Sequence, residues 1–307
     1  MQLSVVIPAH NPDFGRLCRT LAGLRGQTLQ EAEWEAVLVD NASEPALDAR
    51  DFLDVAPANF RIVREENTGL TPARLRGFKE TTTPIIVLAD DDNVLAPDYL
   101  SQVLAIAAEY PRLGTWSGNV ILSFEPGAIP PPAAWRACLT ERHVKSDTIS
   151  VDRNHHDSTP WGAGLCVRRE VAESYAVELA ANPLRRQLDL QGRTLLYGGD
   201  TDIAYVGCAQ GLSKGVFARL RLTHLIPSGR CETPYLLRSI EGHAYSSVLH
   251  EFVLTGRIPL YCTDRLWLLR RALHRWFLPR VDRLSASANA RGIARAVHDI
   301  RRLQTSP

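Results

Sequence analysis

The sequence predicts an α/β fold built on a doubly wound, mostly parallel sheet flanked by helices. Short β-branched apolar runs alternate with stretches of helical periodicity, an alternation typical of parallel sheets. Polar residues follow three of these runs, namely Asp40, Asn67 and the triple aspartate at residues 90–92. Ligands of such sheets bind beyond the carboxyl ends of the strands, so these residues predict a binding site along one edge.

The first half of the chain supplies four of the expected strands. Residues 3–8, LSVVIP, form a β-branched run that ends at a proline and predicts a buried strand. A helix is predicted over about residues 14–29, where leucines recur on one face. Further apolar runs predict the next strands, at residues 36–39, 60–63 and 85–88.

The second half begins with a proline-rich segment at residues 124–135, FEPGAIPPPAAW, which cannot continue a helix and predicts a long loop. The alternation then resumes with a strand near residues 165–167 and a helix from Glu170. A strand-like run at residues 217–222 follows, and from Asp264 the chain is helical and basic.

Composition excludes several classes of protein. The net charge is +1, so no global field favours nucleic acid. Six scattered cysteines without a C-x-x-C pair predict reduced thiols in a cytoplasmic protein rather than a disulfide framework. The N-terminus lacks the basic and apolar regions of a signal peptide, and no apolar run approaches the roughly 20 residues of a membrane span.

The triple aspartate admits two interpretations. Carboxylate oxygens are preferred ligands of hard divalent cations, and Mg²⁺ is usually held by one or two carboxylates together with substrate phosphates. An Asp-x-Asp pair at a strand end therefore suits a metal that bridges to a diphosphate. Aspartate and asparagine also favour turns, so a solvated turn at the strand end is the alternative.

A series of segments, in order, resembles the family 2 glycosyltransferases. They are SVVIPAHN, VLVDNAS, NTGLTPARLRGF, VLADDDNVLAPDYL, WGAGLCVRRE and YGGDTDIAYVGCAQGLSKGVFARLRLTHLIP, and the resemblance covers roughly residues 2–235. It implies a GT-A fold and transfer of a sugar with inversion. It divides the chain into a catalytic domain at 1–240, with a nucleotide-sugar half at about 1–122 and an acceptor half at about 123–240, and a basic helical extension at 241–307.

The resemblance assigns roles at the nucleotide edge. Asp40 would accept a hydrogen bond from the base, and Arg74 would contact the base or the phosphates. Asp90 and Asp92 match the D-x-D motif, with Asp92 as a direct ligand of Mn²⁺ or Mg²⁺. The implied nucleotide-sugar set is Pro8, Ala9, Asn11, Asp40, Asn67, Arg74, Asp90 and Asp91. Taken alone, Asp40 could instead cap a helix, and Arg74 could be a solvated helix charge.

Asp200 is the candidate general base. An inverting transfer needs a carboxylate that takes the proton of the acceptor hydroxyl, a contribution of typically ~10²–10⁴-fold in rate. The family usually carries Glu-Asp at this point, whereas this chain has Gly199 before Asp200. The alternative for Asp200 is a helix N-cap.

The remaining assignments concern the acceptor, the phosphates and the metal. Trp161, Gly162 and Asp202 are the expected acceptor-binding residues. Arg230 is expected to clamp a phosphate, because a guanidinium suits bidentate recognition of oxygen. His224 is expected to join Asp92 and Asp90 as a metal ligand, since a neutral imidazole can ligate Mn²⁺. Trp161 could equally lie in the core, and His224 could be structural.

The basic C-terminal region also has two interpretations. In DRLWLLRRALHRWFLPR, Leu266, Leu269, Leu273, Trp276 and Phe277 follow helical spacing, flanked by arginines. Such a helix can pack its apolar stripe on the domain, or it can lie at an anionic membrane surface.

The expected function is therefore an inverting glycosyltransferase that uses a nucleoside diphosphate sugar, with uridine as the favoured base, and Mn²⁺ or Mg²⁺. Its acceptor would be a carbohydrate or a lipid-linked sugar, as in the biosynthesis of polysaccharide, lipopolysaccharide or glycoconjugates. One alternative is a catalytically decayed nucleotide-sugar-binding protein. A sugar nucleotidyltransferase ranks lower, because PAHNPDFGRL lacks the glycine-rich basic loop that such enzymes carry after the first strand.

Overall fold

A computed structural model describes residues 1–189, 195–264 and 277–305 of the chain. The strands are β1 (Leu3–Ala9), β2 (Trp34–Asn41), β3 (Phe60–Glu65), β4 (Ile85–Leu88), β5 (Asn93–Leu95), β6 (Leu113–Phe124), β7 (Thr148–Ser150), β8 (Leu165–Arg168) and β9 (Ser213–Ile226). The helices are α1 (Phe14–Arg25), α2 (Leu70–Glu80), α3 (Tyr99–Glu109), α4 (Ala133–Arg136), α5 (Arg169–Ala181), α6 (Gly199–Ala209), α7 (Thr233–Thr255) and α9 (Arg280–Thr305).

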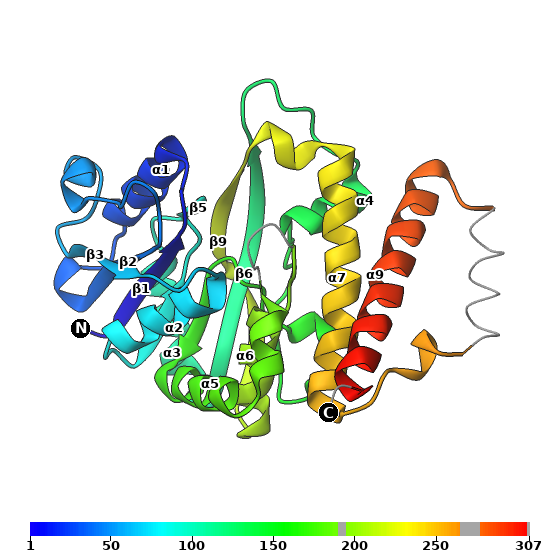
Figure 1. Cartoon of the computed structure of the whole chain (residues 1–307). Coiled ribbons are helices and arrows are strands. Elements are labelled where there is room, and N and C mark those ends of the chain that lie inside the picture. The colour runs from blue at the N-terminus through cyan, green and yellow to red at the C-terminus, as the bar shows by residue number, and fades with distance from the viewer. Residues whose placement is uncertain (190–194, 265–276, 306–307) are drawn as a thin grey trace.

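One sheet organises the molecule, with strand order β3-β2-β1-β4-β8-β6-β9-β5 and β7 added on β9 (Figure 1). Strands β3, β2, β1 and β4 are mutually parallel, and so are β6 and β9. Strand β8 joins these two groups through antiparallel pairs with β4 and β6. Most paired residues lie in parallel pairs, which confirms the predicted α/β class with a mostly parallel sheet.

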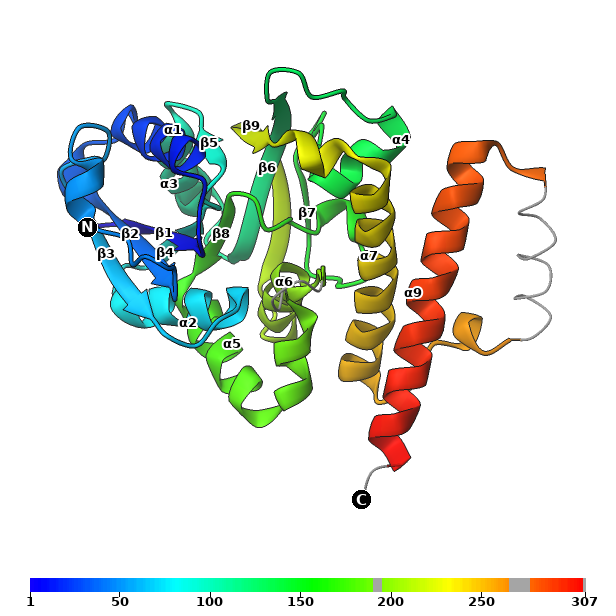
Figure 2. The ribbon, with the colours of Figure 1, turned by 45° about the horizontal axis from the view of Figure 1, so that its top comes forward.

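Helices cover both faces of the sheet, so this part of the molecule has three layers (Figure 2). Alternate residues of β1 point to opposite faces, as the two-residue period of a strand requires. Leu3, Val5 and Ile7 pack in one core with leucines of α1 and with α3. Val6 packs in the other core, with α2, α5 and α6. Residues 3–9 are therefore buried, with Ser4 as the single polar residue among them, as expected for a central parallel strand.

Local signals explain where α1 begins and ends. Asp13 accepts a hydrogen bond from the backbone N–H of Arg16 at 2.9 Å and acts as the N-cap. The helix ends at Arg25, before the predicted residue 29, because Gly26 follows and its N–H returns to the carbonyl oxygen of Ala22. The short strands β5 and β7 were not predicted, since three residues carry too little periodicity.

The C-terminal helix α9 lies alongside α7 and packs its apolar side against it (Figure 1). The shared core includes Ala244 and Val248 of α7 and Ala296 and Ile300 of α9. The expected boundary at residue 240 falls inside α7, so it coincides with no element end and stays a prediction.

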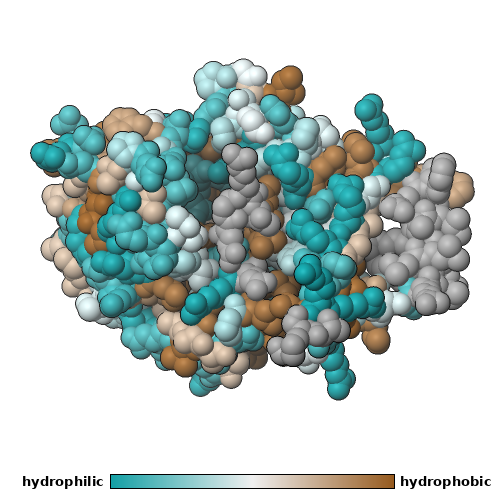
Figure 3. All heavy atoms as spheres, viewed as in Figure 1, coloured by the Kyte–Doolittle hydropathy of each residue, from teal (hydrophilic) through white to brown (hydrophobic). Residues whose placement is uncertain are grey.

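The tryptophan-containing basic stretch at 265–276 lies outside the described residues, and membrane contact through the C-terminal region stays a prediction. Phe277, at its end, is 85% exposed. Within residues 1–189, 195–264 and 277–305, every helix falls short of the length and apolarity that crossing a membrane requires. On the face shown in Figure 3, hydrophobic residues form small areas separated by hydrophilic ones.

Candidate active site

The triple aspartate connects two strands from different parts of the sheet. Strand β4 ends at Leu88 and β5 begins at Asn93, so the triple aspartate makes up most of the four-residue link, 89–92, between them. Strand β5 pairs antiparallel with β9, and Asn93 lies opposite His224 in the register. The backbone N–H of Leu225 also donates to the carbonyl oxygen of Asp92 at 2.9 Å. This pairing brings the aspartates beside residues more than a hundred positions later in the chain.

Asp92 is the centre of a buried polar cluster. It is 3% exposed. Its Oδ2 accepts a hydrogen bond from Nη1 of Arg230 at 3.0 Å, and its Oδ1 lies 3.3 Å from Nε2 of His224. The side-chain amide of Asn93 also donates to Oδ1, at 3.0 Å. The structure therefore brings together the predicted metal ligands Asp92 and His224 and the predicted phosphate clamp Arg230.

A carbonyl group fixes the orientation of the His224 ring. The carbonyl oxygen of Leu139 lies 3.0 Å from Nδ1 of His224 and can only accept, so Nδ1 carries a proton. The hydroxyl of Thr140 lies 2.8 Å from the same nitrogen. The other nitrogen, Nε2, is thereby directed at Asp92. Histidines that bind metals usually have this arrangement, in which the distal N–H is held by a carbonyl or carboxylate.

The three aspartates differ in burial and in pKa, since Asp92 is buried whereas Asp90 and Asp91 are half-buried. Burial acts to raise the pKa of Asp92, but His224 and Arg230 outweigh it, and the pKa is lowered. Burial and the neighbouring Asp92 raise the pKa of Asp90. Burial, Asp92 and Asp90 raise the pKa of Asp91 to about 7. Burial acts to lower the pKa of His224, whereas Asp92 raises it more strongly.

These residues fit a divalent cation by the chemistry of their donors. One buried carboxylate, Asp92, one half-buried carboxylate, Asp90, and one oriented imidazole, His224, suit Mn²⁺ or Mg²⁺. Among the described residues, however, no group of three His, Cys, Asp or Glu side chains is gathered closely enough to enclose an ion. A cation held here would therefore complete its coordination with substrate oxygens, the mode in which Mg²⁺ commonly binds diphosphates.

A second cluster surrounds Arg74 of α2. This arginine is 4% exposed, which overturns the alternative of a solvated helix charge. Burial acts to lower its pKa, but the carboxylates of Asp189, Asp200 and Asp90 raise it. A Cβ atom added to Gly162 would lie 3.2 Å from Nη2 of Arg74 and 3.4 Å from Oδ2 of Asp200. Three predicted site residues, Arg74, Gly162 and Asp200, thus meet at one place.

Asp200 lies in the first turn of α6. The N-cap of that helix is Gly198, so the alternative of Asp200 as N-cap is wrong. Its Oδ1 accepts a hydrogen bond from the adjacent N–H of Thr201 at 2.9 Å, whereas Oδ2 is the oxygen that lies near Gly162.

Asp189 was missed by sequence reasoning. It lies 4% exposed before α6, and its Oδ2 accepts hydrogen bonds from Nη1 of Arg74 and from the hydroxyl of Thr71, both at 3.0 Å. Burial raises its pKa, and the charge of Arg74 opposes that effect. No motif surrounds this residue in the sequence, so only the fold reveals it.

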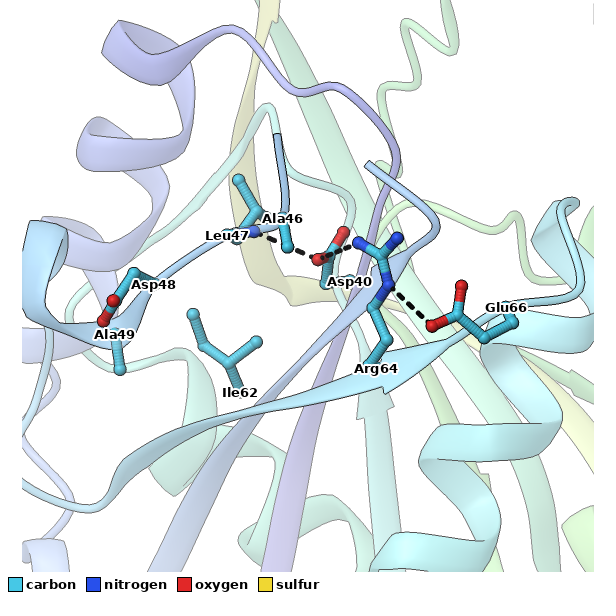
Figure 4. A pocket seen from close by; sticks show the side chains of 8 residues that line it. All are labelled: Asp40, Ala46, Leu47, Asp48, Ala49, Ile62, Arg64 and Glu66. Carbon is cyan, nitrogen blue, oxygen red and sulfur yellow. Dashed lines mark hydrogen bonds and ion pairs between the residues drawn. The ribbon is translucent and has the colours of Figure 1, made fainter. Parts of the chain in front are cut away.

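Asp40 lines a cavity of about 620 Å³ at the ends of β2 and β3 (Figure 4). The carboxylate is 1% exposed and accepts from the N–H groups of Ser43 and Leu47 and from Nη1 of Arg64, the last at 2.7 Å. Burial acts to raise its pKa, but these donors lower it. Figure 4 shows Arg64, which sequence reasoning also missed, between Asp40 and Glu66. Asp40 therefore organises the loop that lines the cavity.

The predicted residues near the end of β1 are tied to the same edge. Pro8 and Ala9 are buried and lie opposite Val39 and Asp40 in the parallel register. Asn11 has a left-handed φ of 46°, and its N–H donates to the hydroxyl of Ser43 at 2.9 Å.

Asn41 joins the next two loops on this edge. Its side chain donates to the carbonyl oxygen of Asn67 at 2.7 Å and accepts from the N–H of Gly69 at 2.7 Å. Asn41 follows Asp40 in the segment VLVDNAS, but its role depends on contacts that the sequence alone does not show.

The predicted acceptor residues separate in the structure. Trp161 is half-buried, and the guanidinium of Arg142 lies 4.7 Å from its ring centroid. Asp202 has no exposed surface, and its Oδ1 accepts from Nη1 of Arg185 at 2.6 Å and lies 3.1 Å from Nε2 of His250. In this arrangement Asp202 offers no surface to an acceptor, whereas Gly162 lies beside Asp200.

Comparison with known sequences places this site in a family context. The family model described as Glycosyl transferase family 2 matches residues 4–175, more than half of the chain. A glycosyltransferase of Bacillus subtilis (strain 168), the uncharacterized YwdF, is 30% identical over 103 residues, which are 34% of this chain and 37% of the relative. Polypeptide N-acetylgalactosaminyltransferase 13 of Rattus norvegicus is 33% identical over 111 residues, 33% of this chain and 19% of the relative. The chain thus matches well under half the length of these curated relatives.

Comparison with solved structures concerns the fold. The chain is similar to S. aureus TarS 1–349 in complex with UDP-GlcNAc, with a TM-score of 0.50 and 13% identity over 99% of this chain and 92% of that one. It is also similar to GalNAc-T7 with UDP, GalNAc and Mn²⁺, with a TM-score of 0.54 and 16% identity over 92% of this chain and 56% of that one. The predicted GT-A fold is confirmed by these similarities.

Proposed function

The chain belongs to glycosyltransferase family 2, and from that membership we propose that it transfers a sugar from a nucleoside diphosphate sugar to an acceptor hydroxyl with inversion of the anomeric carbon. The observation that carries this proposal is the position of Arg74. The charges of Asp200 and Asp90 both act on this buried guanidinium. The candidate base and one aspartate of the triple aspartate therefore both lie near enough to Arg74 for their charges to act on it.

The transfer itself needs one base and one leaving group. The acceptor oxygen forms a bond to the anomeric carbon while the bond from that carbon to the diphosphate oxygen breaks. The hydroxyl proton passes to the carboxylate of Asp200, and the bonding electrons leave with the nucleoside diphosphate. Asp200 is only half-buried, so an acceptor hydroxyl can approach its carboxylate.

The diphosphate is proposed to lie near the Asp92 cluster. Arg230 lies 3.0 Å from Asp92 and is partly exposed, so its guanidinium can also reach oxygens of a bound diphosphate. Asp92, His224 and Asp90 would hold a divalent cation, Mn²⁺ or Mg²⁺. When bound, the ion would stabilise the negative charge that develops on the leaving diphosphate.

The nucleoside is proposed to occupy the cavity lined by Asp40 and Arg64. It lies at the same sheet edge as the aspartates, and its volume of about 620 Å³ is ample for a base and ribose. A uridine donor is favoured by the UDP-sugar and UDP named in the structures of TarS and GalNAc-T7. The acceptor is proposed to be a carbohydrate or a lipid-linked sugar.

The test is a thermal-shift screen of the purified protein with UDP-GlcNAc, GDP-mannose, CMP-sialic acid and dTDP-glucose, each with Mn²⁺, Mg²⁺ or EDTA. A ligand at 100 times its Kd raises the stability of the native state by roughly 2.7 kcal/mol, an easily measured shift. We expect one nucleotide class to give a metal-dependent shift that Asp92→Ala abolishes.

The exposed Asp54 provides a matched control, because Asp54→Ala removes a carboxylate of the same kind away from the site and should keep the shift. Release of nucleoside diphosphate from the same donor then tests turnover. Metal-dependent binding without any release would support the catalytically decayed, binding-only alternative. Absence of a shift with every donor would contradict the proposal as a whole.

A further inference from the structure

The carboxylate of Asp189 lies directly against the backbone of Gly199. A Cβ atom added to Gly199 would lie 2.3 Å from Oδ2 and 2.8 Å from Oδ1 of Asp189. Separations below 3.0 Å are essentially never found for real Cβ atoms, so residue 199 has no room for a side chain while Asp189 is in place. The carboxylate of Asp189 thus occupies the volume that a side chain at residue 199 would fill.

Asp189 also determines where Arg74 is held. Its Oδ2 accepts from Arg74 Nη1 and from the Thr71 hydroxyl, so one oxygen is fixed by two donors on successive turns of α2. All of these groups are buried. Nη2 of the same guanidinium is directed toward Gly162, near Oδ2 of Asp200. Between the described residues Arg74 and Asp200, however, no hydrogen bond or ion pair forms, whereas Arg74 and Asp189 form both.

We propose that Asp189 is a positioning residue that supplies the carboxylate absent from position 199 and keeps Arg74 from pairing with Asp200. This inference rests on the proposed glycosyltransferase activity. Asp200 can accept a proton only while its carboxylate is free, and a guanidinium bonded to it would make it a weaker base. Asp189 therefore acts on the reaction through Arg74 and does not itself contact the substrate.

The charged groups that act on Asp200 come from three elements. Arg74 projects from α2, Asp189 precedes α6, and His243 projects from α7. Loss of Asp189 removes one negative charge near Asp200 and releases Arg74 toward it. Both changes favour the ionised form of Asp200 and lower its proton affinity, so the acid limb of the pH–rate profile is expected to move to lower pH.

The experiment compares four forms of the full chain: wild type, Asp189→Asn, Gly199→Asp, and the double variant Asp189→Ala/Gly199→Asp. Metal-dependent release of UDP from UDP-GlcNAc, or of the corresponding diphosphate from whichever donor the thermal screen identifies, gives kcat, KM and the pH profile. Asp189→Asn keeps the shape and the acceptor oxygen but removes the charge. We expect its kcat to fall about 10²-fold, the loss typical of a displaced catalytic geometry, with an acid limb at lower pH.

The double variant moves the carboxylate from one backbone position to the other. An aspartate at residue 199 places its oxygens near those of the deleted Asp189, and helical backbone at that position accepts a side chain. We expect the double variant to recover kcat to within about tenfold of wild type. Gly199→Asp alone is expected to lose thermal stability, because both carboxylates then compete for one volume.

The outcomes separate this inference from the proposed function. If wild type releases no nucleoside diphosphate from any donor, the proposed function fails, and the inference fails with it. If wild type is active and Asp189→Asn keeps its kcat and pH profile, the inference alone is overturned. If Asp189→Asn fails to fold, the double variant decides. A double variant that folds but is inactive, or that also fails to fold, shows that a carboxylate at residue 199 cannot replace Asp189 and overturns the inference.

Discussion

At the scale of single residues, two aspartates of one helix turn have opposite environments. Asp200 and Asp202 both lie in the first turn of α6, but two residues of a helix point in widely different directions. Asp200 lies beside Arg74 and Gly162, whereas Asp202 is enclosed with Arg185 and His250. The second carboxylate oxygen of Asp202, Oδ2, is buried without a hydrogen-bond partner. This network connects α6 to the segment before it and to α7, and we therefore propose a structural role for Asp202.

Asp202→Ala is therefore expected to destabilise the fold. It removes the buried one of the two carboxylates that pair with the guanidinium of Arg185, the other being that of the half-exposed Glu178. Breaking a buried pair costs up to about 3–5 kcal/mol. Urea denaturation followed by circular dichroism measures the change. In the matched variant Asp200→Ala, turnover should fall while the free energy of unfolding changes by less than about 1 kcal/mol. A raised acceptor KM for Asp202→Ala at unchanged stability would instead favour the predicted acceptor role.

Much of the site was predictable residue by residue, but not its buried partners. The triple aspartate, Asp200 and Arg74 lie in segments that resemble a family, and the structure brings them to one sheet edge. Asp189 carries no such signal, because its function depends on contact with Gly199 and Arg74, which are distant or unremarkable in the sequence. Arg64 was missed for the same reason, since its partner Asp40 lies on the neighbouring strand.

At the scale of elements, close approach between helices depends on glycine. A Cβ atom added to Gly292 of α9 would lie 2.2 Å from the carbonyl oxygen of Glu241 in α7 and 2.9 Å from Cβ of Ala244. Around this contact, Arg291 and Arg295 both pair with the side chain of Glu241. The glycine permits the backbones to touch, and the arginines lie at the rim.

Gly292→Ala is expected to separate the two helices. Overpacking of this kind costs typically about 1–3 kcal/mol, which exceeds the gain of up to about 1 kcal/mol that alanine brings to a helix. The control is Gly15→Ala in α1, where the added Cβ meets only Oδ1 of Asp13 at an ordinary 3.4 Å. Urea denaturation should show a loss for Gly292→Ala and no loss for Gly15→Ala. Equal effects of the two substitutions would contradict the close helix contact.

Some strands could be predicted from the sequence and others could not. Strands β1 to β4 and β8 were predicted because each is a short apolar run bounded by polar residues or proline. Strand β6 is longer, and Gly118 interrupts it where the register with β9 shifts, which obscures its periodicity. The antiparallel pairs of β8 and β5 could not be anticipated, since strand direction depends on distant partners. These pairs nevertheless complete the site.

At the scale of the whole molecule, α9 is connected to the candidate site through a shared hydrophobic cluster. Ile293, Val297 and Ile300 of α9 share one hydrophobic cluster with α7, with Leu196 and with Leu188, the residue directly before Asp189. A change in the packing of this cluster is therefore expected to displace Asp189, whose carboxylate holds Arg74.

A chain that ends at Asp264 is expected to lose both stability and turnover. The shortened chain lacks the stabilisation that burial of Ile293, Val297 and Ile300 supplies, about 1.5–3 kcal/mol for each side chain. The midpoint of thermal unfolding and the release of nucleoside diphosphate measure the two effects, and increased binding of a hydrophobic dye would report the uncovered face of α7. Unchanged turnover and stability in the shortened chain would show that α9 is an independent appendage.

The pairing of β5 with β9 also sets the order in which the protein can become competent during synthesis. The segment that carries the aspartates leaves the ribosome well before β9, yet Asp92 gains His224 and Arg230 only through that later strand. A nascent chain that has completed residues 4–175, the part that matches its family, still holds three neighbouring carboxylates without these partners. Contacts of such long sequence separation form slowly. The proposed binding of a donor is therefore expected to be a late event, and a nucleotide sugar added during refolding should stabilise only chains in which β9 has already docked.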